Sequence, residues 1–220
     1  MATALRGFYA IVDATSDARE APADGADTGG LETRARQLLA AAPCFLQLRA
    51  KGATARAMAA VSRRLLVLCR EAGVRFCVND RLDVALAIGA DAVHLGQDDM
   101  PLADAQRVRA LAGRPDLIIG FSTHNRAQAI AAAEAGADYL GFGPVFGTST
   151  KVNPDPTVGL DALAEVCSLV LVPIVAIGGI TLANVASVAQ AGAAAAAPIA
   201  AISAASDPLA AAHQIAAAFR

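Results

Sequence analysis

The sequence predicts an α/β protein that folds as a single (β/α)8 (TIM) barrel domain over residues 1–220. Three observations lead to this prediction: the chain length, the alternation of short apolar runs with alanine-rich segments, and an internal repeat. A barrel of this kind takes roughly 250 residues, or somewhat fewer when its loops are short, so 220 residues suit one domain. The hydrophobic fraction of 55% can supply a large core.

Short apolar runs and helical segments alternate along the whole chain. Eight runs are expected to form strands: Phe8–Val12, Phe45–Arg49, Arg75–Asn79, Ala92–Leu95, Leu117–Phe121, Tyr139–Gly143, Ile174–Ile177 and Ala196–Ala200. Eight segments are expected to form helices: Leu31–Ala41, Thr54–Glu71, Leu82–Ile88, Leu102–Leu111, Arg126–Glu134, Leu160–Cys167, Leu182–Gln190 and Pro208–Phe219. Such alternation indicates a parallel sheet with right-handed crossovers, either closed or doubly wound.

The internal repeat favours the closed form. Residues 87–96 (AIGADAVHLG) match residues 134–143 (EAGADYLGFG), and residues 190–199 (QAGAAAAAPI) form a weaker third copy. Each copy places a glycine just past a helix, where a left-handed cap needs it, and then enters a strand. Equivalent repeated units suit a barrel better than an open sheet, and the first strand is not followed by the glycine fingerprint of dinucleotide-binding folds.

Composition and charge exclude several classes of function. The net charge is −2 and no basic run is present, so nucleic acid is not an expected partner. The four cysteines lack metal-ligand spacing and are expected to be reduced thiols. Neither a secretory signal nor a long apolar run is found, so we expect a cytoplasmic protein without membrane contact. The expected partners are small-molecule substrates, and the sequence leaves a homo-oligomer open.

Functional groups of such barrels collect where the strands end, and the second strand ends in Gln47, Arg49 and Lys51. Side chains alternate along an extended chain, so these three would point together into the barrel mouth. Arg and Lys bind phosphate oxygens through charge-assisted hydrogen bonds, which favours an anion site. The alternative is a solvated strand end with extended cations.

Acidic residues follow the next two strands. Asp80 comes directly after Asn79, and Asp98 and Asp99 follow the fourth strand. Neighbouring parallel strands lie about 4.8 Å apart, so carboxylates at their ends can share one cation. Two carboxylates plus phosphate oxygens are typical ligands of Mg2+. The alternative is that these aspartates only cap the helices that follow.

Three further segments are compatible with phosphate binding. Ser122, after the fifth strand, could donate to a phosphate or cap a helix. After the sixth strand comes either an anion-binding loop or an ordinary solvated one, containing Thr148, Ser149, Thr150 and Lys151. Gly178 and Gly179 after the seventh strand allow backbone amides to approach a phosphate, or form a tight turn only. The loops 14–30 and 147–159 would lie on the same rim.

Together these segments resemble the thiamine-phosphate synthase family, in the same order over almost the whole chain. The motifs that carry the resemblance are QLRxK at 47–51, ND at 79–80, HLGQxD at 94–99, GxSxH at 120–124, GPxFxTxTK at 143–151 and AIGGI at 176–180. The family joins a hydroxymethylpyrimidine diphosphate to a thiazole phosphate and releases pyrophosphate. The resemblance therefore implies a Mg2+-dependent transferase with a dissociative mechanism.

The resemblance also implies roles for individual residues. The pyrimidine diphosphate would be contacted by Gln47, Leu48, Arg49, Ala50, Lys51, Asn79, Ser122 and Lys151. Magnesium would be held by Asp80 and Asp99. The thiazole phosphate would be contacted by Thr148, Ser149, Thr150 and Gly179, and by the backbone of Ile199 and Ala200. The catalytic set would be Arg49, Lys51, Ser122 and Lys151.

The eighth strand departs from the family pattern. The family usually has a serine where this chain has Ala200, and Pro198 replaces an ordinary aliphatic residue. A proline inside a strand removes one hydrogen-bond donor, so we expect a distorted eighth strand and a reshaped phosphate site. Two other functions remain as alternatives: a thiazole tautomerase-like isomerase, which would not need the full diphosphate and magnesium set, and a non-catalytic barrel that binds thiamine precursors.

Overall fold

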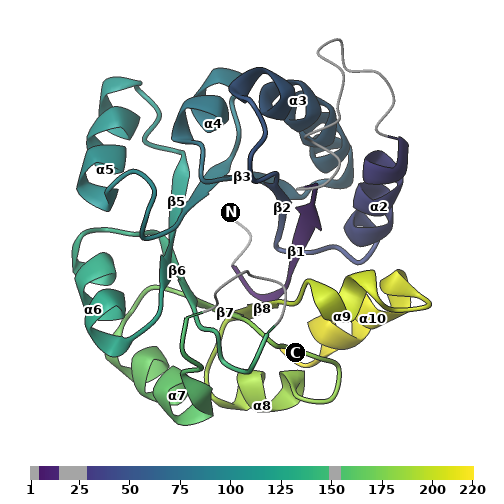
Figure 1. Ribbon diagram of the computed structural model, residues 1–220, viewed down its shortest axis with the longest axis vertical. Helices are drawn as coiled ribbons and strands as arrows, with labels where there is room; N and C mark the ends of the chain where they lie inside the picture. The colour runs from purple at the N-terminus through teal and green to yellow at the C-terminus, as the bar shows by residue number, and fades with distance from the viewer. Residues whose placement is uncertain (1–4, 15–28, 149–154) are drawn as a thin grey trace.

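The structure is a computed structural model that describes residues 5–14, 29–148 and 155–220. Eight parallel strands close into a barrel in chain order, and helices surround it (Figure 1). The strands are β1 (Gly7–Asp13), β2 (Phe45–Arg49), β3 (Arg75–Asn79), β4 (Ala92–Leu95), β5 (Ile118–Thr123), β6 (Tyr139–Phe142), β7 (Ile174–Ile177) and β8 (Ala195–Ala197). The predicted barrel is therefore confirmed.

The described helices follow the predicted pattern, with one addition. They are α2 (Gly29–Leu39), α3 (Ala55–Ala72), α4 (Leu82–Ile88), α5 (Leu102–Leu111), α6 (Arg126–Glu134), α7 (Gly159–Leu169), α8 (Val185–Gln190), α9 (Ala200–Ser203) and α10 (Pro208–Ala217). The short α9 was not expected from the sequence. Across the described ranges, no helix has the length and apolar character needed to span a membrane.

The internal repeat has a structural cause. Gly89, Gly136 and Gly192 each follow a helix with a positive φ, of 70°, 85° and 96°, which is the left-handed conformation that glycine adopts without strain. In the first two copies an aspartate comes two residues later. Asp91 accepts a hydrogen bond of 2.8 Å from the backbone amide of Phe76, and Asp138 accepts one of 2.8 Å from that of Ile119. The third copy has Ala194 at this place.

Two apolar layers hold the barrel. One lies between the strands and the helices, and the other fills the barrel interior around Tyr9, Phe45, Cys77 and Tyr139. Side chains alternate between these layers along each strand, as the period of two requires. The interior layer lies below the carboxyl ends of the strands, where catalytic groups of such barrels collect.

The eighth strand differs from its prediction. β8 ends at Ala197, whose partner is Ile177 of β7, and Pro198 lies beyond this last pair. The expectation that Pro198 interrupts an interior strand was therefore wrong, because the missing amide falls outside the ladder. Ala200 is the first residue of α9 and not the end of a strand. Residues 15–28 and 149–154 lie outside the described ranges, and the expected loops there remain predictions.

Candidate active site

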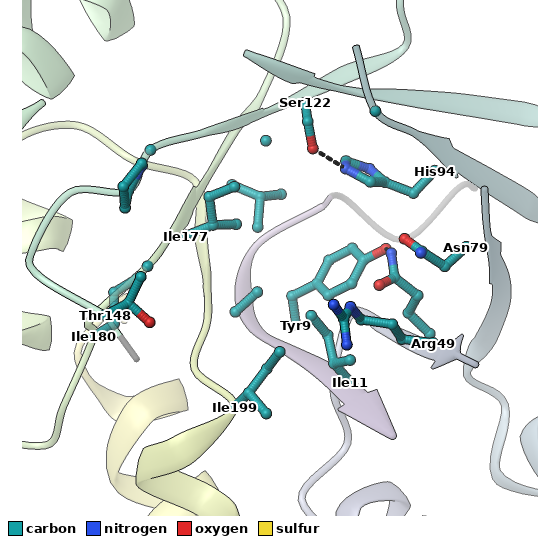
Figure 2. A pocket seen from close by; sticks show the side chains of 18 of the residues that line it. Tyr9, Ile11, Arg49, Asn79, His94, Ser122, Thr148, Ile177, Ile180 and Ile199 are labelled. Atoms are coloured by element: carbon teal, nitrogen blue, oxygen red, sulfur yellow. Dashed lines mark hydrogen bonds between the residues drawn. The ribbon is translucent and has the colours of Figure 1, made fainter. Parts of the chain in front are cut away.

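A cavity of about 580 Å3 opens where the strands end, and all eight strands contribute to its wall (Figure 2). Its floor is formed by aromatic side chains, and its rim carries cations, carboxylates and glycine-rich turns. The predicted site residues that line it are Gln47, Arg49, Lys51, Asn79, Asp80, Asp99, Ser122, Thr148, Gly179, Ile199 and Ala200. The topology thus brings together groups that are up to 153 positions apart, from Gln47 to Ala200.

Some predicted residues are not in the cavity. Leu48 and Ala50 are buried in the layer between strands and helices, because alternation points them away from the barrel axis. Only their backbone could contact a ligand. Ser149, Thr150 and Lys151 lie outside the described residues, so their roles remain expectations from the resemblance.

The two described cations of the rim are paired with carboxylates. Arg49 Nη1 lies 2.5 Å from Asp13 Oδ2, and Lys51 Nζ lies 3.8 Å from Asp80 Oδ2. Asp13 was not singled out from the sequence, where it is one polar residue after an apolar run. The register of β1 and β2, which places Asp13 opposite Arg49, reveals it. The Arg49 side chain is only 17% exposed, and a half-buried guanidinium needs such a partner.

Asp80 and Asp99 form a pair of like charges. Burial and the nearby charge of Asp99 raise the pKa of Asp80 to about 6, while Lys51 and Arg49 oppose this shift. Asp99 Oδ2 accepts a hydrogen bond of 2.6 Å from the amide of Gly96, which fixes the turn after β4. Such mutual repulsion would be relieved by a cation between the two carboxylates.

The alternative role of these aspartates as helix caps is wrong. The residue that caps α4 is Arg81, and the one that caps α5 is Pro101, with no side-chain hydrogen bond in either case. Asp80 instead has a φ of 65°, a left-handed conformation that Asp and Asn adopt more readily than most other residues with side chains. The chain adopts this conformation where it turns the Asp80 carboxylate toward the cavity.

Ser122 likewise is not a cap, since Asn125 caps α6 with its side chain. The Oγ atom of Ser122 lies 2.8 Å from Nε2 of His94, a hydrogen bond that Figure 2 shows. Burial lowers the pKa of His94 to about 4, against the opposing effect of Asp99. His94 is therefore a neutral imidazole near pH 7.

The glycine pair after β7 is packed against the loop after β6. A Cβ on Gly178 would lie 2.3 Å from Cβ of Pro144, and one on Gly179 would lie 2.4 Å from the carbonyl oxygen of Gly147. No side chain fits at either position. The tight turn is thus real, and it also brings the backbone of both glycines to the cavity wall.

His124 joins the two ends of the loop between β6 and α7. Its Nδ1 lies 2.5 Å from the carbonyl oxygen of Gly143, and its Nε2 lies 3.5 Å from Oδ2 of Asp155. Both ring nitrogens thus face acceptor oxygens, one on each side of the loop. His124 therefore contacts the loop that carries Thr148 at both Gly143 and Asp155.

The closed barrel and the polar cavity at the carboxyl ends of its strands define a (β/α)8-barrel enzyme, since catalytic groups collect at this face of the fold. The sequence profile of the thiamine monophosphate synthase family matches residues 9–202. The chain belongs to this family.

Individual relatives agree with this assignment. The chain is 49% identical over 152 residues to the thiamine-phosphate synthase of Chlorobium phaeovibrioides, covering 69% of this chain and 71% of that protein. It is 46% identical over 215 residues to that of Anaeromyxobacter dehalogenans, covering 98% of this chain and 88% of that protein. A solved structure of thiamine phosphate pyrophosphorylase from Pyrococcus furiosus superimposes with a TM-score of 0.76 at 37% identity, covering 84% of this chain and 87% of that one.

Proposed function

We propose that this chain is a thiamine-phosphate synthase, which condenses 4-amino-2-methyl-5-(diphosphooxymethyl)pyrimidine with a thiazole phosphate. The observation that carries the proposal is the meeting of Arg49 and Lys51 with the carboxylates of Asp80 and Asp99 on one rim of the cavity. This set suits a diphosphate held by cations and by a metal ion. The curated relatives of the chain bear the same activity in their names.

The cavity offers complementary surfaces for the pyrimidine diphosphate. Gln47 and the aromatic floor lie below the rim and provide an amide and flat apolar surface for the ring. Arg49 and Lys51 lie above them and would bind the diphosphate oxygens, together with Asn79 and Ser122. Lys151 completes this set by resemblance.

The carboxylate pair fits Mg2+. Within the described ranges no cluster of three or more potential metal-binding side chains occurs, so Asp80 and Asp99 would supply two ligands and leave positions for diphosphate oxygens and water, as is usual for this ion. Burial and the charge of Asp99 raise the pKa of Asp80 even though Lys51 lies 3.8 Å away, which supports a cation site at this pair. When bound, Mg2+ would neutralise charge on the diphosphate.

The reaction requires no side-chain nucleophile. The bond between the pyrimidine methylene carbon and the diphosphate oxygen breaks, and both electrons leave with pyrophosphate. The lone pair of the thiazole nitrogen then forms the new carbon–nitrogen bond. Arg49 and Lys51 would stabilise the negative charge that develops on the leaving group, which is electrostatic preorganisation toward the transition state. Because His94 is neutral near pH 7, it would not bind the diphosphate as a cation.

The thiazole phosphate would bind on the opposite wall. Thr148, Gly179, Ile199 and Ala200 line the cavity there, and backbone amides at these places can donate to phosphate oxygens. The family serine is absent at Ala200, so one donor fewer is available.

The isomerase alternative is not favoured by the comparisons, and a direct experiment separates all three functions. Purified protein is incubated with Mg2+ and each substrate alone or both together, and products are identified by mass spectrometry. A synthase forms thiamine phosphate and pyrophosphate in equal amounts only with both substrates. Conversion of a thiazole phosphate in the absence of the pyrimidine would instead indicate an isomerase, and binding without conversion would indicate a precursor-binding barrel.

A further inference from the structure

A chain of buried polar groups runs across the floor of the cavity. The Nε2 atom of Gln47 lies 3.0 Å from Tyr9 Oη, and Tyr9 Oη lies 2.9 Å from Tyr139 Oη. Tyr139 Oη lies 3.0 Å from His94 Nδ1, and His94 Nε2 lies 2.8 Å from Ser122 Oγ. Five side chains from five different strands are thus joined from the bottom of the cavity to its rim.

The fold makes room for this chain at a specific position. Tyr139 is 1% exposed and stacks on His94, with ring centroids 5.5 Å apart. A Cβ on Gly120 would lie 2.0 Å from Cζ of Tyr139, so only glycine leaves space for this ring. Hydroxyl groups buried this deeply are costly unless they form hydrogen bonds, and apolar Phe would fill the same space. Packing alone therefore does not explain the hydroxyl group of Tyr139.

The donor at one end favours one direction for these hydrogen bonds. The amide nitrogen of Gln47 can only donate, so the hydroxyl of Tyr9 accepts from it and has its own proton to donate to Tyr139. Burial raises the pKa of both tyrosines well above its usual value, so each keeps its proton. Tyr139 then donates to Nδ1 of His94.

We propose that Tyr139 is a positioning residue that fixes His94 in the Nε2–H tautomer, so that the Ser122 hydroxyl is held as a hydrogen-bond donor to the diphosphate. His94 donates from Nε2 to Ser122 Oγ, and the hydroxyl proton of Ser122 is left to point into the cavity. The opposite direction would turn the Ser122 proton toward His94 and present only lone pairs to an anionic oxygen, which is repulsive. This inference rests on the proposed function for the role of Ser122.

The tautomer can be measured without turnover. The chain has three histidines, and long-range proton–nitrogen correlation spectra of 15N-histidine protein distinguish the two tautomers of each ring; loss of signals in His94→Gln assigns His94. We expect His94 in the Nε2–H form in the native protein. We expect Tyr139→Phe to shift it toward a mixture with the Nδ1–H form.

Tyr9→Phe is the matched control. It removes a hydroxyl from the same floor, but Tyr139 keeps its proton and its contact with His94. Because Tyr9→Phe removes the group that directs the Tyr139 proton but keeps the Tyr139 hydroxyl, the tautomer of His94 should shift less than in Tyr139→Phe. An Nδ1–H tautomer in the native protein, or an unchanged tautomer in Tyr139→Phe, would overturn the proposal.

Kinetics give a second readout. Tyr139→Phe should lower kcat/KM for the pyrimidine diphosphate about tenfold, the effect of one charge-assisted hydrogen bond, while KM for the thiazole phosphate stays unchanged. A changed KM for the thiazole phosphate, or an unchanged kcat/KM for the pyrimidine diphosphate, would contradict a role through Ser122. The spectra need no substrate, so they test the hydrogen-bond direction independently of activity. A native protein with the expected tautomer but no synthase activity would contradict the proposed function and leave the hydrogen-bond direction standing.

Discussion

Replacing Asp80 with asparagine tests the carboxylate pair at the cavity rim. The side chain of Asp80 is 24% exposed, and its pKa is raised from 3.8 to about 6 by burial and by Asp99. Asparagine has the same shape and tolerates the φ of 65° at this position. The substitution therefore removes the charge without adding backbone strain, which Asp80→Ala would add.

The expected change in the free energy of unfolding follows from the raised pKa of Asp80. A rise of about two units corresponds to roughly 3 kcal/mol at about 1.4 kcal/mol per unit, and partial exposure reduces this to about 2 kcal/mol. The folded protein binds the proton of Asp80 more tightly than the unfolded chain does. The free energy of unfolding therefore falls as the pH rises from about 4 to about 6, and the loss is complete above this range. In Asp80→Asn this contribution should be absent.

The assay is denaturant unfolding between pH 4 and pH 8, with and without MgCl2. Without Mg2+, we expect Asp80→Asn to be more stable than the native protein at pH 7 by about 2 kcal/mol, and equally stable near pH 4. Added Mg2+ should stabilise the native protein and leave the variant unchanged. Asp98→Asn is the control, because Asp98 also lines the cavity and lies next to Asp99; it should keep the response to Mg2+. A less stable Asp80→Asn protein at pH 7, or one that still responds fully to Mg2+, would refute this reasoning.

Three further predictions concern the loop after β6, the phosphate wall and the repeat. His124→Gln should lower kcat/KM about tenfold with little change in Tm, and a double-mutant cycle with Asp155→Asn should show coupling because the two side chains contact each other; additive losses would contradict the contact. Ala200→Ser should lower KM for the thiazole phosphate about threefold by adding one donor at the cavity wall, and an unchanged KM would refute a phosphate there. Ala194→Asp should raise the free energy of unfolding by about 1 kcal/mol, because the aspartates of the other two repeat copies bind backbone amides of the preceding strand; a loss of stability would show that the third copy cannot make this bond.

The barrel could be predicted from the sequence because its signals are local. Alternation of strand and helix patterns and the repeated glycine caps are read within a few residues, and the bounds of β2, β3, β4 and β7 were predicted to the residue. The eighth strand was misjudged because five alanines in a row carry no periodicity that separates a strand from the start of α9.

The site was predictable where strand alternation determines direction and less so where contacts cross the barrel. Gln47, Arg49 and Lys51 line the cavity as their spacing predicts. Tyr9 and Tyr139 gave no such signal, because a tyrosine in an apolar run looks like core, and their hydrogen bond joins residues 130 positions apart. Only the closed barrel brings these hydroxyls together.

The most direct test of the account is the formation of thiamine phosphate by the purified protein from both substrates, with Mg2+ and after chelation with EDTA. Arg49→Gln is measured alongside, with Arg81→Gln as a matched control, because Arg81 pairs with Asp83 and is absent from the cavity wall. We predict product with the native protein and Arg81→Gln, strong loss with Arg49→Gln, and none without Mg2+. A folded protein that forms no thiamine phosphate, or one whose turnover is unaffected by EDTA and by Arg49→Gln, would contradict the account.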